Sequence, residues 1–139
     1  MRWRNRLEPE SLVQHALAHP PEGFGWLGGV PAPVFEAPFD LLTTADEEFK
    51  ARLAGLPLFA RWSRWLRIRT AFVGTTVTEY APLPTDATPE ALAAAVRTGP
   101  GRRHALSIVK DIPQDSPLLE EADNAYARQL AEACAAQGY

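Results

Sequence analysis

The sequence predicts a mixed α/β domain, in which a small mixed sheet is flanked by helices. Residues 68–80 are rich in β-branched side chains, and residues 104–112 form a second apolar segment of strand length. A stretch with helical spacing of apolar residues follows each of these segments. The 139 residues match the usual length of one domain, so we expect a single domain over residues 1–139.

Residues 1–40 are expected to hold one helix and an ordered, extended segment. The helix covers residues 8–18 and ends before Pro20 and Pro21, because proline cannot continue a helix. Residues 20–39 are rich in glycine and proline but also contain four aromatic side chains (Phe24, Trp26, Phe35 and Phe39). A disordered linker would not carry so many aromatics, so we predict an ordered loop that packs against the rest of the domain.

Residues 41–139 are expected to form an α/β unit that begins with two short helices. Thr44 and Glu47 match a capping box, in which the hydroxyl and the carboxylate satisfy free backbone N–H groups of the first turn. This helix is expected to end near Ala54, because Gly55 and Pro57 follow it. A second short helix is expected over residues 58–65.

The remainder of the unit is expected to alternate strand, helix, strand, helix. The first strand covers residues 68–80, where Gly74 indicates a bulge or a close approach of another group. A helix over residues 88–97 is capped by Thr88, with Pro89 at its first position. A strand over residues 104–112 and a helix over residues 117–137 complete the chain, and Asp115 and Ser116 are the expected caps of that last helix.

Composition narrows the classes of function. The formal net charge of −3 gives no overall attraction to nucleic acid or anionic lipid, so we expect no nucleic-acid partner. The single cysteine, Cys134, excludes an internal disulfide and fits a reducing compartment. No apolar run approaches the roughly 18 residues of a membrane span, and the N-terminus lacks the apolar core of a signal peptide. We therefore expect a cytoplasmic protein without a membrane span.

Arginine and tryptophan alternate over residues 61–69, and this pattern has three interpretations. It suits a nucleic-acid stacking patch, an interfacial membrane helix, or an amphipathic helix with a structural role. The structural interpretation is favoured, because Phe59, Trp62 and Trp65 fall on one helical face together with Leu66. Residues 2–6 also alternate arginine with tryptophan, and there we expect a frayed basic terminus.

Other sequence patterns indicate no catalytic motif. The glycines of residues 97–101 follow a helix and precede a strand, so they predict a helix end and a turn, not a phosphate loop. His15, His19 and His104 lack the spacing of metal ligands, so we expect no metal. Cys134 lies late in an alanine-rich helix, where a small buried residue is expected.

The strongest candidate site is the polar stretch that begins with Lys110 and Asp111. It lies at the C-terminal end of the strand predicted over residues 104–112, and open α/β sheets bind ligands at the carboxyl ends of their strands. Thr76 and Tyr80 provide polar groups on the other predicted strand. These four residues are our candidates for the lining of a substrate cleft, in which Tyr80 and Asp111 bond an amine and Lys110 pairs with a carboxylate or phosphate. No residue is assigned a catalytic role.

Three stretches resemble the N-terminal part of bacterial GNAT-superfamily N-acyltransferases of the FemAB-like, peptidoglycan-biosynthesis type. They are residues 34–44 (VFEAPFDLLTT), residues 74–80 (GTTVTEY) and residues 108–113 (IVKDIP), and the resemblance covers about residues 30–139. It implies part of an acyl-CoA N-acyltransferase fold and transfer of an acyl group from an acyl-CoA or aminoacyl donor to an amine.

The chain also departs from that family. Its members are more than twice as long, and the pyrophosphate loop (Arg/Gln-x-x-Gly-x-Gly/Ala) is absent here. We therefore expect a truncated or split relative that binds no cofactor alone, and a second copy or a partner chain that completes its sheet. The alternative is a non-catalytic interaction module, which docks through the helix of Phe59, Trp62 and Trp65 or through the last helix. A third alternative is RNA binding through residues 61–69.

Overall fold

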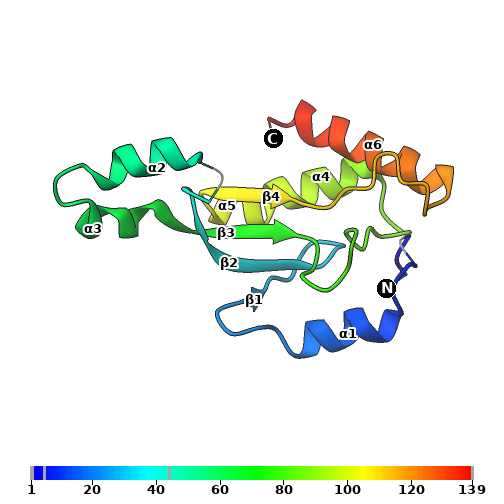
Figure 1. Cartoon of the computed structure of the whole chain (residues 1–139). Helices are drawn as coiled ribbons and strands as arrows, with labels where there is room; N and C mark the ends of the chain where they lie inside the picture. The colour runs from blue at the N-terminus through cyan, green and yellow to red at the C-terminus, as the bar shows by residue number, and fades with distance from the viewer. Residues whose placement is uncertain (1, 5, 44, 139) are drawn as a thin grey trace.

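A computed structural model of the chain describes residues 2–4, 6–43 and 45–138 (Figure 1). Four strands form one mixed sheet in the order β1-β2-β3-β4: Gly25–Trp26, Val34–Asp40, Arg67–Val73 and Leu106–Val109. The pairs β1·β2 and β2·β3 are antiparallel, and β3·β4 is parallel. The predicted mixed α/β class is confirmed.

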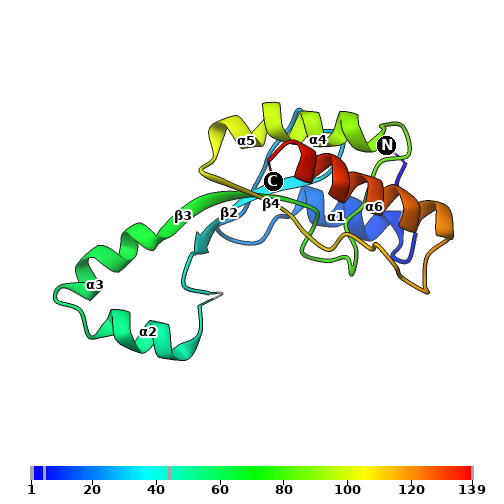
Figure 2. The ribbon, with the colours of Figure 1, turned by 90° about the horizontal axis from the view of Figure 1, so that it is seen from above.

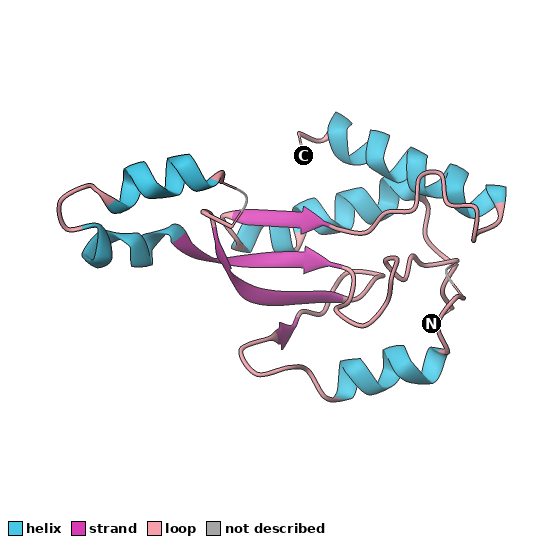
Figure 3. Ribbon diagram, viewed as in Figure 1, coloured by secondary structure: helices cyan, strands magenta, loops and turns pink. Residues whose placement is uncertain are grey.

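The helices connect and flank this sheet (Figure 3). Their bounds are α1 Glu10–Ala18, α2 Glu47–Ala54, α3 Phe59–Trp62, the 3-10 helix η1 Ser63–Leu66, α4 Pro89–Thr98, α5 Pro100–Arg103 and α6 Glu121–Ala136. Helix α4 joins the parallel strands β3 and β4, as a crossover between parallel strands requires. No described helix is long and apolar enough to cross a membrane.

The core lies between the sheet and helices α4 and α6, and Figure 2 shows α4 and α5 along one side of the sheet. Val34 and Val73 are register partners that point to this side, where they meet Leu92 and Val96 of α4. Leu130 of α6 packs into the same cluster. The opposite face of the sheet carries Phe35, Phe39 and Phe72, and the rings of Phe35 and Phe72 stack at 5.1 Å.

Strand β2 corrects the predicted ordered loop over residues 20–39. The segment is ordered, but Val34–Asp40 is a strand in spite of Pro38. Leu27 N donates to Val34 O, so even-numbered residues of β2 direct their backbone groups toward β1. The missing N–H of Pro38 would point toward β1, but β1 pairs only with Phe35 and Glu36 and has ended before Pro38. No hydrogen bond of the sheet is therefore lost at Pro38.

The N-terminal segment is also ordered, which corrects the expected frayed terminus. Trp3 is only 7% exposed and forms a bridge with Pro84. Arg4 N donates to Leu83 O at 2.8 Å, and the Arg4 guanidinium lies 4.2 Å from the centre of the Tyr126 ring. This segment thus connects the loop that contains Leu83 and Pro84 to helix α6.

Two predicted helix starts need correction. The side chain of Asp46 caps α2 by accepting from Phe49 N at 2.6 Å, while Thr44, the expected cap, lies outside the described residues. The last helix begins at Glu121 and not at residue 117, and neither Asp115 nor Ser116 caps it. Ser116 instead exchanges two hydrogen bonds with the buried side chain of Asn124.

The helix predicted over residues 58–65 exists but does not fully bury an apolar face. It changes from α3 to the tighter helix η1 at Ser63, which alters the angular spacing of the side chains. No residue of α3 or η1 is buried, and Trp65 is 74% exposed. Phe59, Trp62 and Leu66 of the predicted apolar face are partly buried, whereas Trp65 is exposed, so the segment covers this face only in part.

Candidate functional site

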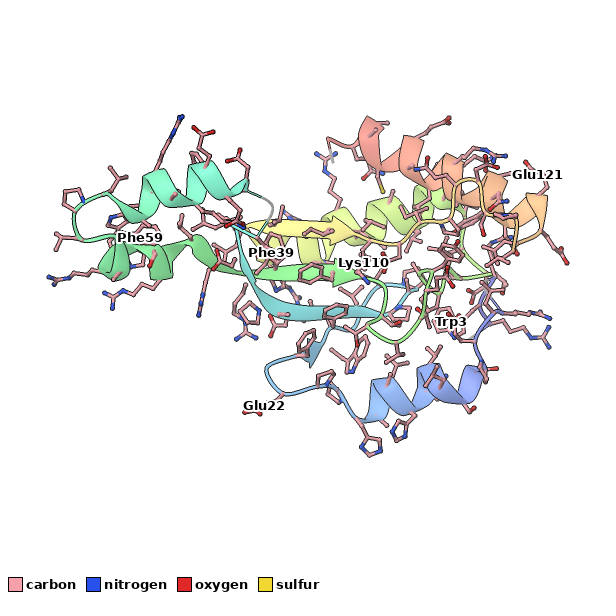
Figure 4. All side chains as sticks on the ribbon, viewed as in Figure 1. Trp3, Glu22, Phe39, Phe59, Lys110 and Glu121 are labelled. Carbon is pink, nitrogen blue, oxygen red and sulfur yellow. The ribbon has the colours of Figure 1, made fainter. Side chains whose placement is uncertain are left out.

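The strand predicted over residues 104–112 is shorter, because β4 ends at Val109, so Lys110 and Asp111 directly follow the strand. Lys110 is labelled in Figure 4. The Lys110 ammonium pairs with the Asp111 carboxylate and donates to Thr75 O at 3.1 Å. Asp111 has a φ of 54°, in the left-handed region that non-glycine residues rarely occupy. Both side chains are partly exposed, so the pair sits at the surface.

Thr76 and Tyr80 do not lie on a strand, because β3 ends at Val73 and the segment to Tyr80 is a loop. Gly74, with a φ of 133°, ends the strand, and Lys110 N donates to Val73 O beside it. Thr75 is buried and its hydroxyl accepts from Thr78 N at 3.1 Å, which folds the loop into a turn.

The four predicted site residues are only partly brought together. Thr76 is exposed next to Thr75, whose carbonyl binds Lys110. Tyr80 precedes Ala81, whose N–H donates to Asp111 O at 2.9 Å, so the loop and the end of β4 are joined. However, none of the four principal cavities in the described part of the chain is lined by Thr76, Tyr80, Lys110 or Asp111.

The largest of these four cavities lies instead beside β4. It has a volume of about 640 Å³ and runs between the outer side of β4 and helix α6. We call it the β4–α6 groove. Its walls include all four residues of β4, and Ala131, Cys134 and Ala135 of α6. One end is formed by Arg97, Gly101, His104, Gln137 and Gly138.

The backbone of β4 faces this groove with free hydrogen-bonding groups. No described strand pairs with the outer side of β4, which is the last strand of the sheet. Because Lys110 N donates to Val73 O, the even-numbered residues of β4 bond to β3. The N–H and C=O groups of Ser107 and Val109 consequently point away from β3, toward the groove.

The groove exists because α6 packs on α4 and presents small side chains to β4. Tyr126, Ala127 and Leu130 of α6 pack into the core with α4. Ala131 and Ala135 leave space toward β4. Burial raises the pKa of the Cys134 thiol, so the thiol stays protonated and is a poor nucleophile at neutral pH. Cys134 is thus a small apolar wall residue, as the sequence predicted.

An ionic cluster supports the Arg97 end of the groove. The buried ring of His104, which is 8% exposed, lies 3.0 Å from Glu36 Oε2 through Nε2 and 3.1 Å from Pro100 O through Nδ1. Arg69 pairs with the other oxygen of Glu36. The hydrogen bond from His104 lowers the pKa of Glu36, partial burial opposes this, and Arg69 lowers it further. The cluster joins β2, β3 and the start of β4.

The sequence predicts an incomplete sheet, but it does not place the groove, which depends on how α6 packs beside β4. The available signal was the short apolar stretch Leu106–Val109 followed by a helix with alanines on the facing side. Among the described residues, no group of three or more His, Cys, Asp or Glu side chains is arranged to hold a metal ion. The rings of His15 and His19 contact each other with their centres 4.6 Å apart and their planes tilted by 44°.

Comparison of the chain with protein-family models, with curated proteins and with solved structures gave no match.

Proposed function

We propose that this chain is a protein-interaction module whose β4 edge accepts an extended segment of another polypeptide. The β4–α6 groove supports this proposal, because the backbone groups of Ser107 and Val109 point into it and lack strand partners. An added strand would satisfy those groups, and α6 would contact its side chains. Strand addition beside a helix is a recurring mode of peptide recognition.

The lining of the groove indicates the chemistry of the segment. The small side chains of Ala131, Cys134 and Ala135 leave room for apolar side chains at alternate positions of the segment. Arg97 is exposed at one end and makes no ion pair with a described residue. An acidic side chain at that end of the segment would pair with it.

The test is selection of extended peptides from a displayed heptapeptide library on the full chain. In the variant Ser107→Pro, the missing N–H is one that β3 does not use, so the sheet keeps its internal pairing. The matched control Ser107→Ala keeps the N–H. We expect selected peptides to bind the parent chain and Ser107→Ala alike, and to bind Ser107→Pro at least tenfold more weakly.

A second measurement locates the peptide. Amide hydrogen exchange of Ser107 and Val109 should slow when a selected peptide is added, while the Ile108 amide is already protected by β3. Self-association that is lost in Ser107→Pro would identify a second copy as the segment. Peptides that bind Ser107→Pro and the parent chain equally, or a library that gives no binder, would contradict the proposal.

A second candidate function is N-acyl transfer by the domain once its sheet is completed. The observation that favours it is the Lys110–Asp111 pair, because strained backbone such as that of Asp111 concentrates at functional sites. In this proposal Lys110 binds an acidic group of the substrate, and Tyr80 and Asp111 bond its amine beside Thr76. The acyl-CoA or aminoacyl donor binds to the part of the sheet that a partner supplies.

Calorimetric titration with acetyl-CoA tests the second candidate. We expect no stoichiometric binding to the chain alone, because it lacks the pyrophosphate loop. Binding of acetyl-CoA should develop when a completing segment occupies the β4–α6 groove. Lys110→Ala should then weaken binding of the acceptor substrate and leave binding of the donor unchanged. Tight binding of acetyl-CoA to the chain alone would refute the missing donor site.

A further inference from the structure

Helices α2 and α3 form a hairpin arm that joins β2 to β3 and projects beyond the sheet (Figures 1 and 2). We call residues 47–66, which include η1, the α2–α3 arm. No residue of its three helices is buried. The ion pairs Lys50–Glu47 and Arg52–Glu48 are exposed and contribute little stability. The arm therefore contains ordered helices without a core of its own.

Large apolar side chains are exposed along this arm. Leu58 is 71% exposed and Trp65 is 74% exposed, and Phe49 and Leu56 are also exposed. Phe59 and Trp62 contact each other edge to face at 5.0 Å, and neither is buried. A gathering of exposed apolar side chains on one element indicates an interaction surface.

Leu58, at the tip of the arm, has an unusual backbone conformation. Leu58 has φ 60° and ψ 19°, a left-handed conformation that glycine adopts readily and leucine does not. A glycine at this position would relieve the strain. Leu58 follows Leu56 and Pro57, so the turn presents two leucines at the end of the arm. The Leu58 carbonyl accepts from Arg61 N at the start of α3, whereas its side chain is mostly exposed and buries little surface in this chain.

The charge of the segment is opposite to that of the remainder. The α2–α3 arm contains four basic residues (Lys50, Arg52, Arg61 and Arg64) and two acidic residues (Glu47 and Glu48), which gives it a net charge of +2, although the whole chain has a net charge of −3. Arg61 and Arg64 form no ion pair within the described chain. Because the arm projects, these two arginines lie away from the acidic remainder of the molecule. Salt screens the electrostatic effect of those acidic residues over about 8–10 Å.

We propose that the α2–α3 arm docks on an anionic phospholipid surface. Leu56, Leu58 and Trp65 would enter the interfacial region, where tryptophan and aliphatic side chains bind favourably. Arg61 and Arg64 would lie against the lipid phosphates, with their aliphatic stems along the apolar side chains. The arm lies on the surface and does not span the bilayer.

The exposed leucines favour a lipid surface over a nucleic acid. Single-stranded nucleic acid binds through arginine and through aromatic rings on which bases stack, and an aliphatic side chain offers no such platform. Leu58, the most strained residue of the arm, would thus be idle in a nucleic-acid complex. On a bilayer, every exposed apolar residue of the arm has a favourable environment.

Sedimentation of the full chain with vesicles tests this proposal. The vesicles are pure phosphatidylcholine, or phosphatidylcholine with about one third phosphatidylglycerol. Each arginine near the anionic surface should increase the affinity for the anionic vesicles about fivefold. We expect binding to the anionic vesicles alone, a decrease as salt is raised, and a blue shift of tryptophan emission that is absent in Trp65→Phe.

Three variants identify the residues that bind. Leu58→Gly removes the leucine and relieves the strained backbone, so the chain stays folded while its affinity falls at least tenfold. The pair Arg61→Gln and Arg64→Gln should have a similar effect. Leu118→Ser is the matched control, because Leu118 is exposed outside the arm, and it should bind like the parent chain.

Four outcomes would overturn the proposal. They are absence of binding to anionic vesicles, equal binding to neutral vesicles, unchanged binding of Leu58→Gly, and loss of binding in Leu118→Ser. A single-stranded oligonucleotide that binds equally well to the parent chain and to Leu58→Gly, and displaces the vesicles, would assign the arm to nucleic acid instead.

Discussion

The side chain of Lys110 passes directly over the backbone of Gly74. A Cβ atom added at Gly74 would lie 3.2 Å from the Cγ of Lys110 and 3.8 Å from the Cβ of Ala81. Gly74 also has a φ of 133°, which residues other than glycine rarely adopt. This contact holds the end of β3 against the end of β4, where Lys110 binds Thr75 and Asp111.

Gly74→Ala should therefore destabilise the chain in two ways. Backbone strain of this kind amounts to about 1–3 kcal/mol, and displacement of Lys110 adds to it. Gly29→Ala is the matched control, because Gly29 has a φ of 92° but no atom near its Cβ position. Urea unfolding measures both changes, and equal losses of stability would show that the contact with Lys110 contributes nothing.

The lowered pKa of Glu36 predicts sensitivity to acid. A carboxyl group whose pKa falls on folding stabilises the protein above its ordinary value of 4.5, and this stability is lost as the pH drops through the folded value. Glu36→Gln should be less stable than the parent near pH 7, and the difference should shrink below pH 4.5. Thermal unfolding across this range checks the sign, and a constant difference would contradict it.

Asn124 should be essential for the turn that precedes α6. Its side chain accepts from Ser116 N at 3.1 Å and donates to Ser116 O at 2.9 Å, and both residues are buried. Asn124→Ala leaves two buried backbone groups unpaired, so we expect a loss of about 2–4 kcal/mol from the free energy of unfolding. Asn124→Asp places a buried carboxylate against the Ser116 carbonyl oxygen, so at neutral pH it should destabilise the chain at least as much as Asn124→Ala. Denaturant unfolding of the three chains gives this order.

Cys134 provides a probe of the β4–α6 groove. Its thiol is buried and burial raises its pKa, so reaction with iodoacetamide at neutral pH should be at least tenfold slower than for a free thiol. A peptide that fills the groove should slow the reaction further. Ser107→Pro should abolish this peptide effect without altering the basal rate. Fast alkylation of the folded chain would show that the groove wall opens readily.

The sequence predicted the elements whose residues satisfy local rules. Thr88 caps α4 by accepting from Ala91 N at 3.2 Å, and Pro89 occupies its first turn, as the sequence pattern indicates. Strand β4 and the final helix also lie within their predicted ranges, whereas β3 begins at Arg67 and covers only the first part of the strand predicted over residues 68–80. In each case the signal is a short window of sequence.

The missed features depend on contacts between distant residues. Pro38 argued against a strand, and it is tolerated only because β1 ends before reaching it. The last helix begins late because Asn124 binds Ser116 across eight residues. For the candidate site, Lys110 and Asp111 could be predicted from their place after a strand. The uncovered sheet edge was also expected, but the groove was not, because its shape depends on the small side chains that α6 places beside β4.

The two margins of the sheet differ, and this difference limits how the molecule assembles. Strand β1 consists of Gly25 and Trp26 alone and is surrounded by glycine and proline, which are poor templates for another strand. In the proposed complex, a guest strand would therefore be added beside β4 and not beside β1, so each chain would offer one site for it.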